Sequence, residues 1–304
     1  MGVVTELPGL PALGPLYARS LKALLPLPGG SRGDALPDRS VEVADVEVTA
    51  DEVAAYGRVC GFGLADMVPL TYPHMLAFPL SVHLMVADDF PFALPGLVHV
   101  AQRIEQSDPV RVGDHLDVRV RTTDLRPHKR GRQFDVVAEV DRDGRTVWTG
   151  TSTYLRRGSV PDAPGGGTDA PPEPVVAEPA EPDGPPMSTW RLPKDLGKRY
   201  AAVSGDVNPI HLSPLTSRLG GFSRPIAHGM WTAARSVAAL TDRITGPATL
   251  EVAFKQPVPL PSTVALRSQR TADGWTFTLH DRSGKRLHLS GHLDAPTDRH
   301  SKDQ

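Results

Sequence analysis

The 304-residue sequence has one cysteine, one asparagine and no uninterrupted apolar run near the roughly 18 residues that a membrane span needs. With Cys60 alone, neither an intramolecular disulfide framework nor a cysteine-rich metal site is possible. The formal net charge of −2 and a pI near 6.6 leave no net basic field to hold nucleic acid or an anionic membrane. We therefore expect no membrane span and no nucleic-acid partner.

The remaining composition is that of a globular protein. Hydrophobic residues make up 39% and charged residues 22%, which is enough apolar material for compact cores. A length of 304 residues suits two domains of roughly 100 to 150 residues each. No positively charged start precedes an apolar core, so we expect a cytoplasmic protein without a secretory signal. An amphipathic stretch at residues 17–25 is expected to form a helix that packs on the body.

Residues 158–187 differ in composition from the sequence on either side. They contain a run of three glycines, repeated prolines and acidic residues between them. Such a segment cannot bury enough apolar surface to become ordered, so the composition predicts a linker. The linker would separate an N-terminal domain, residues 1–157, from a C-terminal domain, residues 188–304.

The two halves show the same order of secondary-structure signals. In the first half, a strand at 41–48 and helices at 50–59 and 73–87 precede strands at 98–105, 116–123, 134–141 and 146–155. In the second half, helices at 194–203 and 228–244 precede strands at 249–256, 263–269, 275–280 and 286–292. This order predicts two copies of one α+β domain, each a sheet wrapped on a central helix.

Residue patterns repeat along with the elements. Tyr56 and Gly61 lie 144 positions before Tyr200 and Gly205. The second of the two long helices, at 228–244, also has a small-residue interior typical of a helix that lies close against a curved sheet. The repeat therefore extends from the order of the elements to individual residues.

The strongest local pattern runs from Tyr200 to His211. Gly205 permits a tight turn after a helix, and Asp206 follows it directly. Asn208 is a good cap for the next helical turn, which places His211 just inside that turn. A carboxylate and an imidazole five residues apart across a turn can converge on one small volume, which suits general acid–base chemistry on a water molecule.

Taken singly, an Asp before a helix is usually a cap and a lone His is usually structural. The complete pattern instead resembles the signature of MaoC-like (R)-specific enoyl-thioester hydratases, whose fold is the hotdog. The matching residues are Tyr200, Ser204, Gly205, Asp206, Asn208, Pro209, His211, Phe222, Ile226, Ala227, His228, Gly229 and Met230. Residues 68–73 and 90–92 are similar to actinobacterial double-hotdog 3-hydroxyacyl-thioester dehydratases of fatty-acid and mycolic-acid synthesis.

The resemblance implies a mechanism for this chain. Asp206 and His211 would activate one water, adding it to a trans-2-enoyl thioester or removing it from the (R)-3-hydroxyacyl thioester. The Gly229 N–H would bind the thioester carbonyl. Ser204 and Asn208 would hold the loop, and His228 would have a structural, hydrogen-bonded role. No metal or redox cofactor is expected, because the thioester itself acidifies the α-proton.

The first copy departs from the pattern. The 144-residue offset puts Phe62 in place of Asp206 and Met67 in place of His211, and neither side chain can transfer a proton. In this family such a degenerate half offers room for a long acyl chain. Candidate tunnel residues are Tyr72, Met75 and Phe78, for which ordinary core packing is an equally good explanation.

The expected substrate is an acyl thioester of coenzyme A or of an acyl carrier protein. Basic residues at 128–132, or Arg218, Arg224 and Lys255, could contact its phosphates. The alternatives are a hotdog thioester hydrolase and a non-catalytic acyl-thioester-binding subunit. Two copies in one chain can pair with each other, and a further homodimer is compatible with the fold.

Overall fold

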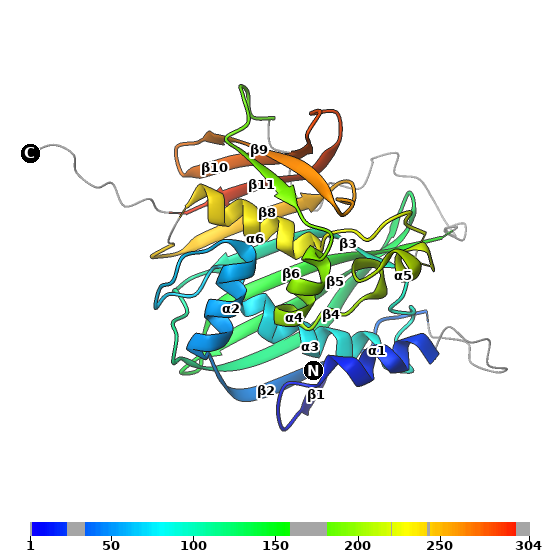
Figure 1. Ribbon diagram of the computed structural model, residues 1–304. Helices are drawn as coiled ribbons and strands as arrows, with labels where there is room; N and C mark the ends of the chain where they lie inside the picture. Colours follow the sequence, from blue (N-terminus) through cyan, green and yellow to red (C-terminus); the bar gives the residue numbers. More distant parts are fainter. Residues whose placement is uncertain (1, 23–33, 159–180, 220, 242–243, 296–304) are drawn as a thin grey trace, which may run out of the picture.

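The computed structural model describes residues 2–22, 34–158, 181–219, 221–241 and 244–295. Within these residues, two similar halves share one continuous 11-stranded sheet (Figure 1). The first half consists of β2 (Arg39–Glu47), α2 (Ala50–Cys60), α3 (Pro73–Met85), β3 (Leu97–Gln106), β4 (His115–His128), β5 (Gly131–Arg142) and β6 (Arg145–Arg157). The second consists of β7 (Ser188–Leu192), α4 (Leu196–Ser204), α6 (Gly229–Leu240), β8 (Ala248–Phe254), β9 (Ser262–Arg270), β10 (Gly274–Asp281) and β11 (Leu287–Asp294).

The strand order is the same in both halves. It runs β2-β4-β5-β6-β3 in the first and, read from the other edge of the sheet, β7-β9-β10-β11-β8 in the second. The halves meet where β3 pairs antiparallel with β8, with Ala101 opposite Ala253. Two copies of one α+β domain therefore join edge to edge, and the predicted double hotdog is the fold of this chain.

A central helix packs against the sheet of each half. Helix α3 packs on β4 and β5, and α6 packs on β10 and β11. In α6, Ala233 and Ala234 have no exposed surface, because small side chains let the helix approach the sheet closely. Helix α3 is buried on nearly all sides, since a further helix, α1 (Leu13–Lys22), packs against it.

The predicted helices and strands are present with small shifts at their ends. The helix predicted at 228–244 is too long, because the backbone becomes extended at Thr241. The helix predicted at 73–87 ends at Met85. Of the predicted linker, residues 159–180 lie outside the described part of the chain; β6 ends at Arg157 and β7 begins at Ser188. No helix among the described residues has the length and apolarity to cross a membrane.

Elements that the sequence did not predict lie at the sheet edges and around the loop after α4. Strand β7 pairs with β9 at one edge, and the short β1 (Val3–Glu6) pairs parallel with β2 at the other. After α4 comes a 3₁₀ turn, η1 (Pro209–His211), at the position where a helical turn capped by Asn208 was predicted, and then a short helix that was not predicted, α5 (Pro214–Leu219). The predicted amphipathic helix at 17–25 corresponds to α1, and residues 23–25 lie outside the described residues.

Candidate active site

The end of helix α4 fixes the position of Asp206. Gly205 has φ +69°, and its N–H donates to the carbonyl of Ala201 at 2.9 Å, which terminates the helix. A Cβ atom at Gly205 would lie 2.5 Å from Cδ1 of Leu13 in α1. The left-handed backbone favours glycine here, and a larger residue would also displace the end of the Leu13 side chain.

Hydrogen bonds within the loop hold the segment from Asp206 to His211. The Ser204 hydroxyl donates to the Tyr200 carbonyl at 2.9 Å and accepts from the Asp206 N–H at 3.2 Å. The Asn208 N–H donates to Oδ1 of Asp206 at 3.1 Å. The Asn208 side chain accepts from the Ile210 N–H at 3.3 Å and so caps η1. The chain thus reaches His211 through a turn of fixed shape.

Two stacked imidazoles lie beside this carboxylate. Nδ1 of His211 donates to the Ile226 carbonyl at 2.7 Å, which leaves its Nε2 as an acceptor. Nε2 of His228 donates to the backbone carbonyl of Asp206 at 3.0 Å and lies 3.7 Å from Oδ2 of the same residue. The two rings stack with centroids 3.7 Å apart. His228 therefore holds the Asp206 backbone, while His211 keeps one ring nitrogen available.

A side chain from outside both repeats completes the site. The hydroxyl of Tyr17, in α1, donates to Oδ1 of Asp206 at 2.5 Å. Sequence reasoning missed this residue, because Tyr17 precedes Asp206 by 189 positions and belongs to no motif. The amphipathic pattern around it indicated a packed helix but gave no sign of what the helix packs on.

The surroundings give Asp206 and His211 different protonation states. Burial raises the pKa of Asp206, but the His228 and His211 imidazoles and the hydrogen bonds from Tyr17 and Asn208 outweigh it and hold that pKa below its usual value. Burial, with His228 second, lowers the pKa of His211 to about 3. At neutral pH the site therefore contains an ionised carboxylate and a neutral imidazole. The two imidazoles stabilise the carboxylate only when they are charged, so at neutral pH the hydrogen bonds from Tyr17 and Asn208 stabilise it.

The amino end of α6 supplies a backbone donor. Gly229 is the first residue of the helix, and no side chain in the described part of the chain caps it. The first N–H groups of a helix have no intrahelical partner and carry the positive end of the helix dipole. A Cβ atom at Gly229 would lie 3.1 Å from Cε1 of Phe254, so a larger residue would press on that ring.

The grouping of Asp206, His211 and His228 also has the composition of a metal site, with ligand atoms within 4.8 Å of one another. Nδ1 of His211 and Nε2 of His228 already donate to carbonyl oxygens. The ring nitrogens that remain are Nε2 of His211 and Nδ1 of His228, and the planes of the two stacked rings differ by only 26°. Because each lone pair lies in the plane of its ring, the two lone pairs lie side by side and do not converge on one ion. The donor set fits proton transfer better than metal binding.

The first repeat contributes polar residues to the surroundings of the site. His99 in β3 stacks on Tyr154 of β6 and contacts Phe254, each with ring centroids 4.9 Å apart. Burial lowers the pKa of His74 to about 4 and that of His99 to about 3, and the charge of Asp206 acts on both. Nε2 of His99 is buried without a hydrogen-bond partner among the described residues. Sequence reasoning missed these residues, because in sequence they belong to an ordinary strand and an ordinary apolar helix.

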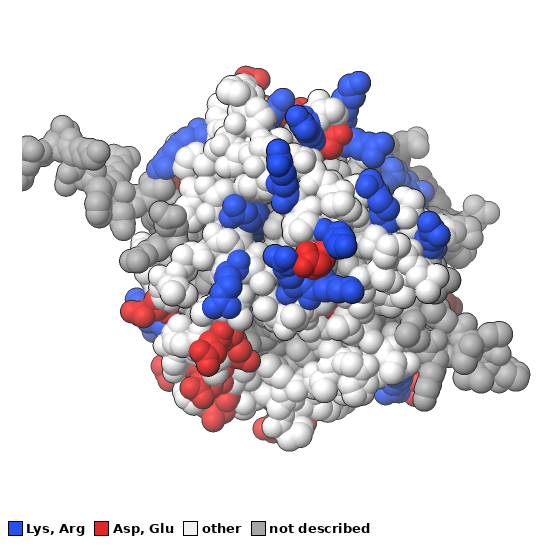
Figure 2. Space-filling view, in the orientation of Figure 1, with Lys and Arg blue, Asp and Glu red and all other residues white. Residues whose placement is uncertain are grey.

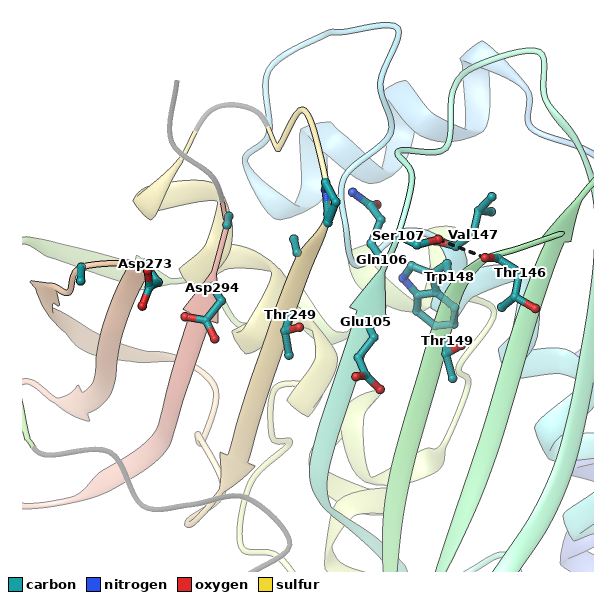
Figure 3. Close-up of a pocket in the computed structure, with 14 residues that line it drawn as sticks. Glu105, Gln106, Ser107, Thr146, Val147, Trp148, Thr149, Thr249, Asp273 and Asp294 are labelled. Atoms are coloured by element: carbon teal, nitrogen blue, oxygen red, sulfur yellow. Dashed lines mark hydrogen bonds between the residues drawn. The ribbon is translucent and has the colours of Figure 1, made fainter. Parts of the chain in front are cut away.

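A surface groove lies away from these residues. It has a volume of about 780 Å³ and is lined by the ends of β3, β6, β8 and β11 (Figure 3). Figure 3 shows Glu105, Thr249 and Asp294 on neighbouring strands of its floor. Glu105 is near the carboxyl end of β3, whereas His99 is near the amino end, about 20 Å away at the rise of a strand. None of the site residues predicted from the sequence lines this groove.

Basic side chains gather across the middle and upper part of the face drawn in Figure 2, whereas acidic ones gather at its lower left. Helix α4, on this face in Figure 1, has exposed Lys198 and Arg199. Arg218 and Arg224 are also exposed, on the segment that follows η1. The elements around Asp206 therefore present positive charge, although the whole chain has a net charge of −2.

Comparison with known proteins identifies the family. A family model described as "MaoC like domain" matches residues 175–287. The 3-hydroxyacyl-thioester dehydratase X of Mycobacterium tuberculosis is 38% identical over 87% of this chain and 92% of its own length. The chain belongs to the MaoC-like dehydratase family. A shorter relative, the (R)-specific enoyl-CoA hydratase of Aeromonas caviae, is 34% identical over 27% of this chain and 67% of its own.

Solved structures agree with this family assignment. A crystal structure of HtdX from M. tuberculosis superposes with a TM-score of 0.73 at 34% identity and covers 85% of this chain and 100% of that chain. Another M. tuberculosis protein, described as having a double hotdog fold, is 16% identical with a TM-score of 0.52, covering 88% of this chain and 96% of that chain. The second likeness concerns the fold alone.

In this MaoC-like chain, the first repeat has an apolar counterpart of the site. Gly61 ends α2 with φ +86°, as Gly205 ends α4, and Phe62 follows it where Asp206 follows Gly205. Phe62 and Met67 line a cavity of only about 20 Å³, next to Val237 of α6. The counterpart has neither a proton-transfer group at these positions nor room for a substrate.

The three candidate tunnel residues are buried around the start and middle of α3. The Tyr72 ring lies 5.6 Å from that of Tyr56, on the side of α2. The Met75 sulfur accepts a hydrogen bond from the Tyr200 hydroxyl at 3.6 Å, and the Phe78 ring lies 5.9 Å from His74. Met75 and Phe78 thus border the residues around Asp206, whereas Tyr72 packs toward the apolar counterpart.

The buried histidines predict acid sensitivity of this MaoC-like fold. His74, His99 and His211 are neutral in the folded protein, with pKa values of about 4, 3 and 3, against an ordinary value of 6.5. Below pH 6.5 the unfolded chain takes up these protons and the folded protein does not, so stability falls as pH drops toward 4, by about 1 kcal/mol per pH unit for each histidine. Calorimetry from pH 8 to pH 4 would measure the decline in Tm, which should be shallower in His99→Phe. An equal decline in that variant would contradict the assignment.

Proposed function

We propose that the protein catalyses the reversible hydration of trans-2-enoyl thioesters to (R)-3-hydroxyacyl thioesters. One observation carries this proposal: the Asp206 carboxyl and the His211 imidazole are fixed next to each other, each with an atom available to bind water. Two titratable groups held in different protonation states are what acid–base catalysis on one water needs. Membership of the MaoC-like family and the names of the relatives support the same reaction.

The proposed chemistry begins with a water that donates hydrogen bonds to Oδ2 of Asp206 and Nε2 of His211. The water oxygen bonds to C3 of the enoyl thioester as one proton passes to this pair. A proton then moves from the pair to C2 on the same face, so the elements of one water add across the double bond. The dehydratase direction reverses each step.

The negative charge that develops during this step needs a donor at the thioester carbonyl. We assign that role to the Gly229 N–H at the amino end of α6, where the helix dipole adds to the hydrogen bond. Ser204, Asn208 and His228 would act on the loop and not on the substrate, since each bonds to the backbone of this segment. The thioester stabilises the enolate-like intermediate itself, so these residues suffice without a redox group.

The proposed substrate is borne by coenzyme A or by an acyl carrier protein, both of which are anionic. The basic residues around α4 and after η1 would attract such a carrier, and binding would then weaken with salt. Met75 and Phe78 of the first repeat would border the acyl chain near Asp206. We expect the reaction in the cytoplasm, and further homodimerisation is compatible with it.

Incubation of the purified protein with trans-2-enoyl-CoA tests the function. The expected result is loss of the enoyl thioester and formation of the (R)-3-hydroxyacyl-CoA alone, measured by chiral product analysis. Release of free coenzyme A would instead indicate a hydrolase, and binding without turnover would indicate a non-catalytic subunit. Enoyl-CoA substrates of increasing acyl-chain length test the role of the first repeat. If activity were lost with all but short acyl chains, the proposal that the first repeat accommodates the acyl chain would be contradicted.

A further inference from the structure

Helix α1 contacts the catalytic loop through two side chains. Leu13 packs against Gly205, and one helical turn later the Tyr17 hydroxyl reaches Asp206. Tyr17 is 7% exposed, so its ring is seated in the core and its hydroxyl has little access to solvent. Helix α1 also packs on α3 of the first repeat, so it bridges the two halves beside the site.

The hydrogen bonds to Asp206 are divided unevenly between its two oxygens. Oδ1 accepts from the Tyr17 hydroxyl and from the Asn208 N–H. Oδ2 lies 3.7 Å from Nε2 of His228, which is too long for a hydrogen bond. Two donors on one oxygen fix the rotation of the carboxylate and leave the other oxygen for a ligand.

We propose that Tyr17 is a positioning residue, whose hydroxyl holds Oδ1 of Asp206 so that Oδ2 is presented to the reacting water. This inference rests on the proposed function and adds a residue to it from outside the family pattern seen in the sequence. Tyr17 acts through Asp206 and has no contact of its own with the water in this scheme.

The charge and burial of the pair make this hydrogen bond a strong one. A hydroxyl donating to a carboxylate forms a short, charge-assisted hydrogen bond, about twice as strong as one between neutral groups. Burial and the charge of Asp206 raise the pKa of Tyr17 well above its usual value, so it remains a donor throughout the working range of pH. Of the two donors to Oδ1, only Tyr17 is a side chain and can be removed by substitution.

Other titratable groups that face Asp206 do not replace this donor. They are His74 in α3, His99 in β3, Tyr154 in β6, Tyr200 in α4, His211 in η1 and His228 just before α6. Burial lowers the pKa of each of these histidines and raises that of each tyrosine, so all are uncharged at neutral pH. Without the Tyr17 hydroxyl, the carboxylate would keep only the backbone donor of Asn208 among the described residues, and its pKa would rise.

Tyr17→Phe tests the effect of Tyr17 on the reaction rate, because it deletes the hydroxyl and keeps the ring that packs α1 against the core. The expected result is a kcat about tenfold lower with KM changed less than about twofold, as for loss of a hydrogen bond to a charged group. The acidic limb of the pH–rate profile should begin at higher pH. The matched control is Tyr56→Phe, which deletes another buried hydroxyl, one that bonds to Thr71 at 2.8 Å and not to Asp206. Equal kinetic effects in both variants, with the acidic limb unmoved, would overturn the proposal.

A double-mutant cycle tests the contact without using activity. Tyr17→Phe should lower Tm in the native background but not in Asp206→Ala, which lacks the acceptor. An equal loss in both backgrounds means that Tyr17 only packs, and it overturns the inference. If the wild type fails to hydrate enoyl thioesters, the proposed function falls with the kinetic test, while the cycle still decides whether Tyr17 holds Asp206.

Discussion

Asp206→Asn is expected to lower kcat by about a hundredfold or more, because a positioned general base contributes on that order to the rate. The amide has almost the shape of the carboxylate, and its oxygen can still accept from Tyr17 and the Asn208 N–H. The variant should therefore fold. Steady-state kinetics on an enoyl thioester measures the loss, and thermal unfolding measures whether the structure survives.

The matched control for this substitution is Asp195→Asn, at the start of helix α4, whose end precedes Asp206. Asp195 is partly exposed and pairs with Arg199 one turn away, so its replacement should leave kcat near that of the wild type. Near-native kcat in Asp206→Asn would remove the carboxylate from the mechanism. A large loss in both variants would indicate that α4 itself is disturbed, a result that contradicts the specific role of Asp206.

The fold could be predicted because its signals are local and repeated. Alternating apolar residues in β4, such as Leu116, Val118 and Val120, are fully buried in the structure, as a half-buried strand requires. The αL glycines Gly61 and Gly205 end corresponding helices, so a repeat in sequence became a repeat in backbone geometry. Strand β7 was missed because it is short, lies at an edge and alternates only between partly and fully exposed residues up to Leu192.

The candidate site could be predicted only where its residues belong to the pattern from Tyr200 to Met230. Asp206, Asn208 and His211 lie in one loop, and the cap that Asn208 provides was deducible from residue type alone. Tyr17 and His99 reach the same volume through tertiary packing, which no spacing in the sequence records. The single asparagine of the chain sits between the two proposed catalytic residues, bonded to both ends of the turn that sets their spacing.

His211→Asn is expected to be as damaging as the change at Asp206, with kcat lower by about a hundredfold or more. The shorter amide can place its nitrogen near the position of Nδ1 and donate to the Ile226 carbonyl, which His211 does now at 2.7 Å. It has no counterpart of Nε2, the atom proposed to hold the water. The variant should therefore keep its Tm and lose its rate.

His211→Gln reverses these two properties and serves as the comparison. Its longer amide reaches the position of Nε2 but leaves the Ile226 carbonyl without its donor, so Tm should fall further than in His211→Asn. An amide does not take a proton near neutral pH, so both variants should be slow if the imidazole transfers one. If His211→Gln were close to the wild type in kcat while His211→Asn were not, the imidazole would only orient the water, and Asp206 alone would act as the base. Near-native rates in both variants would exclude His211 from the reaction.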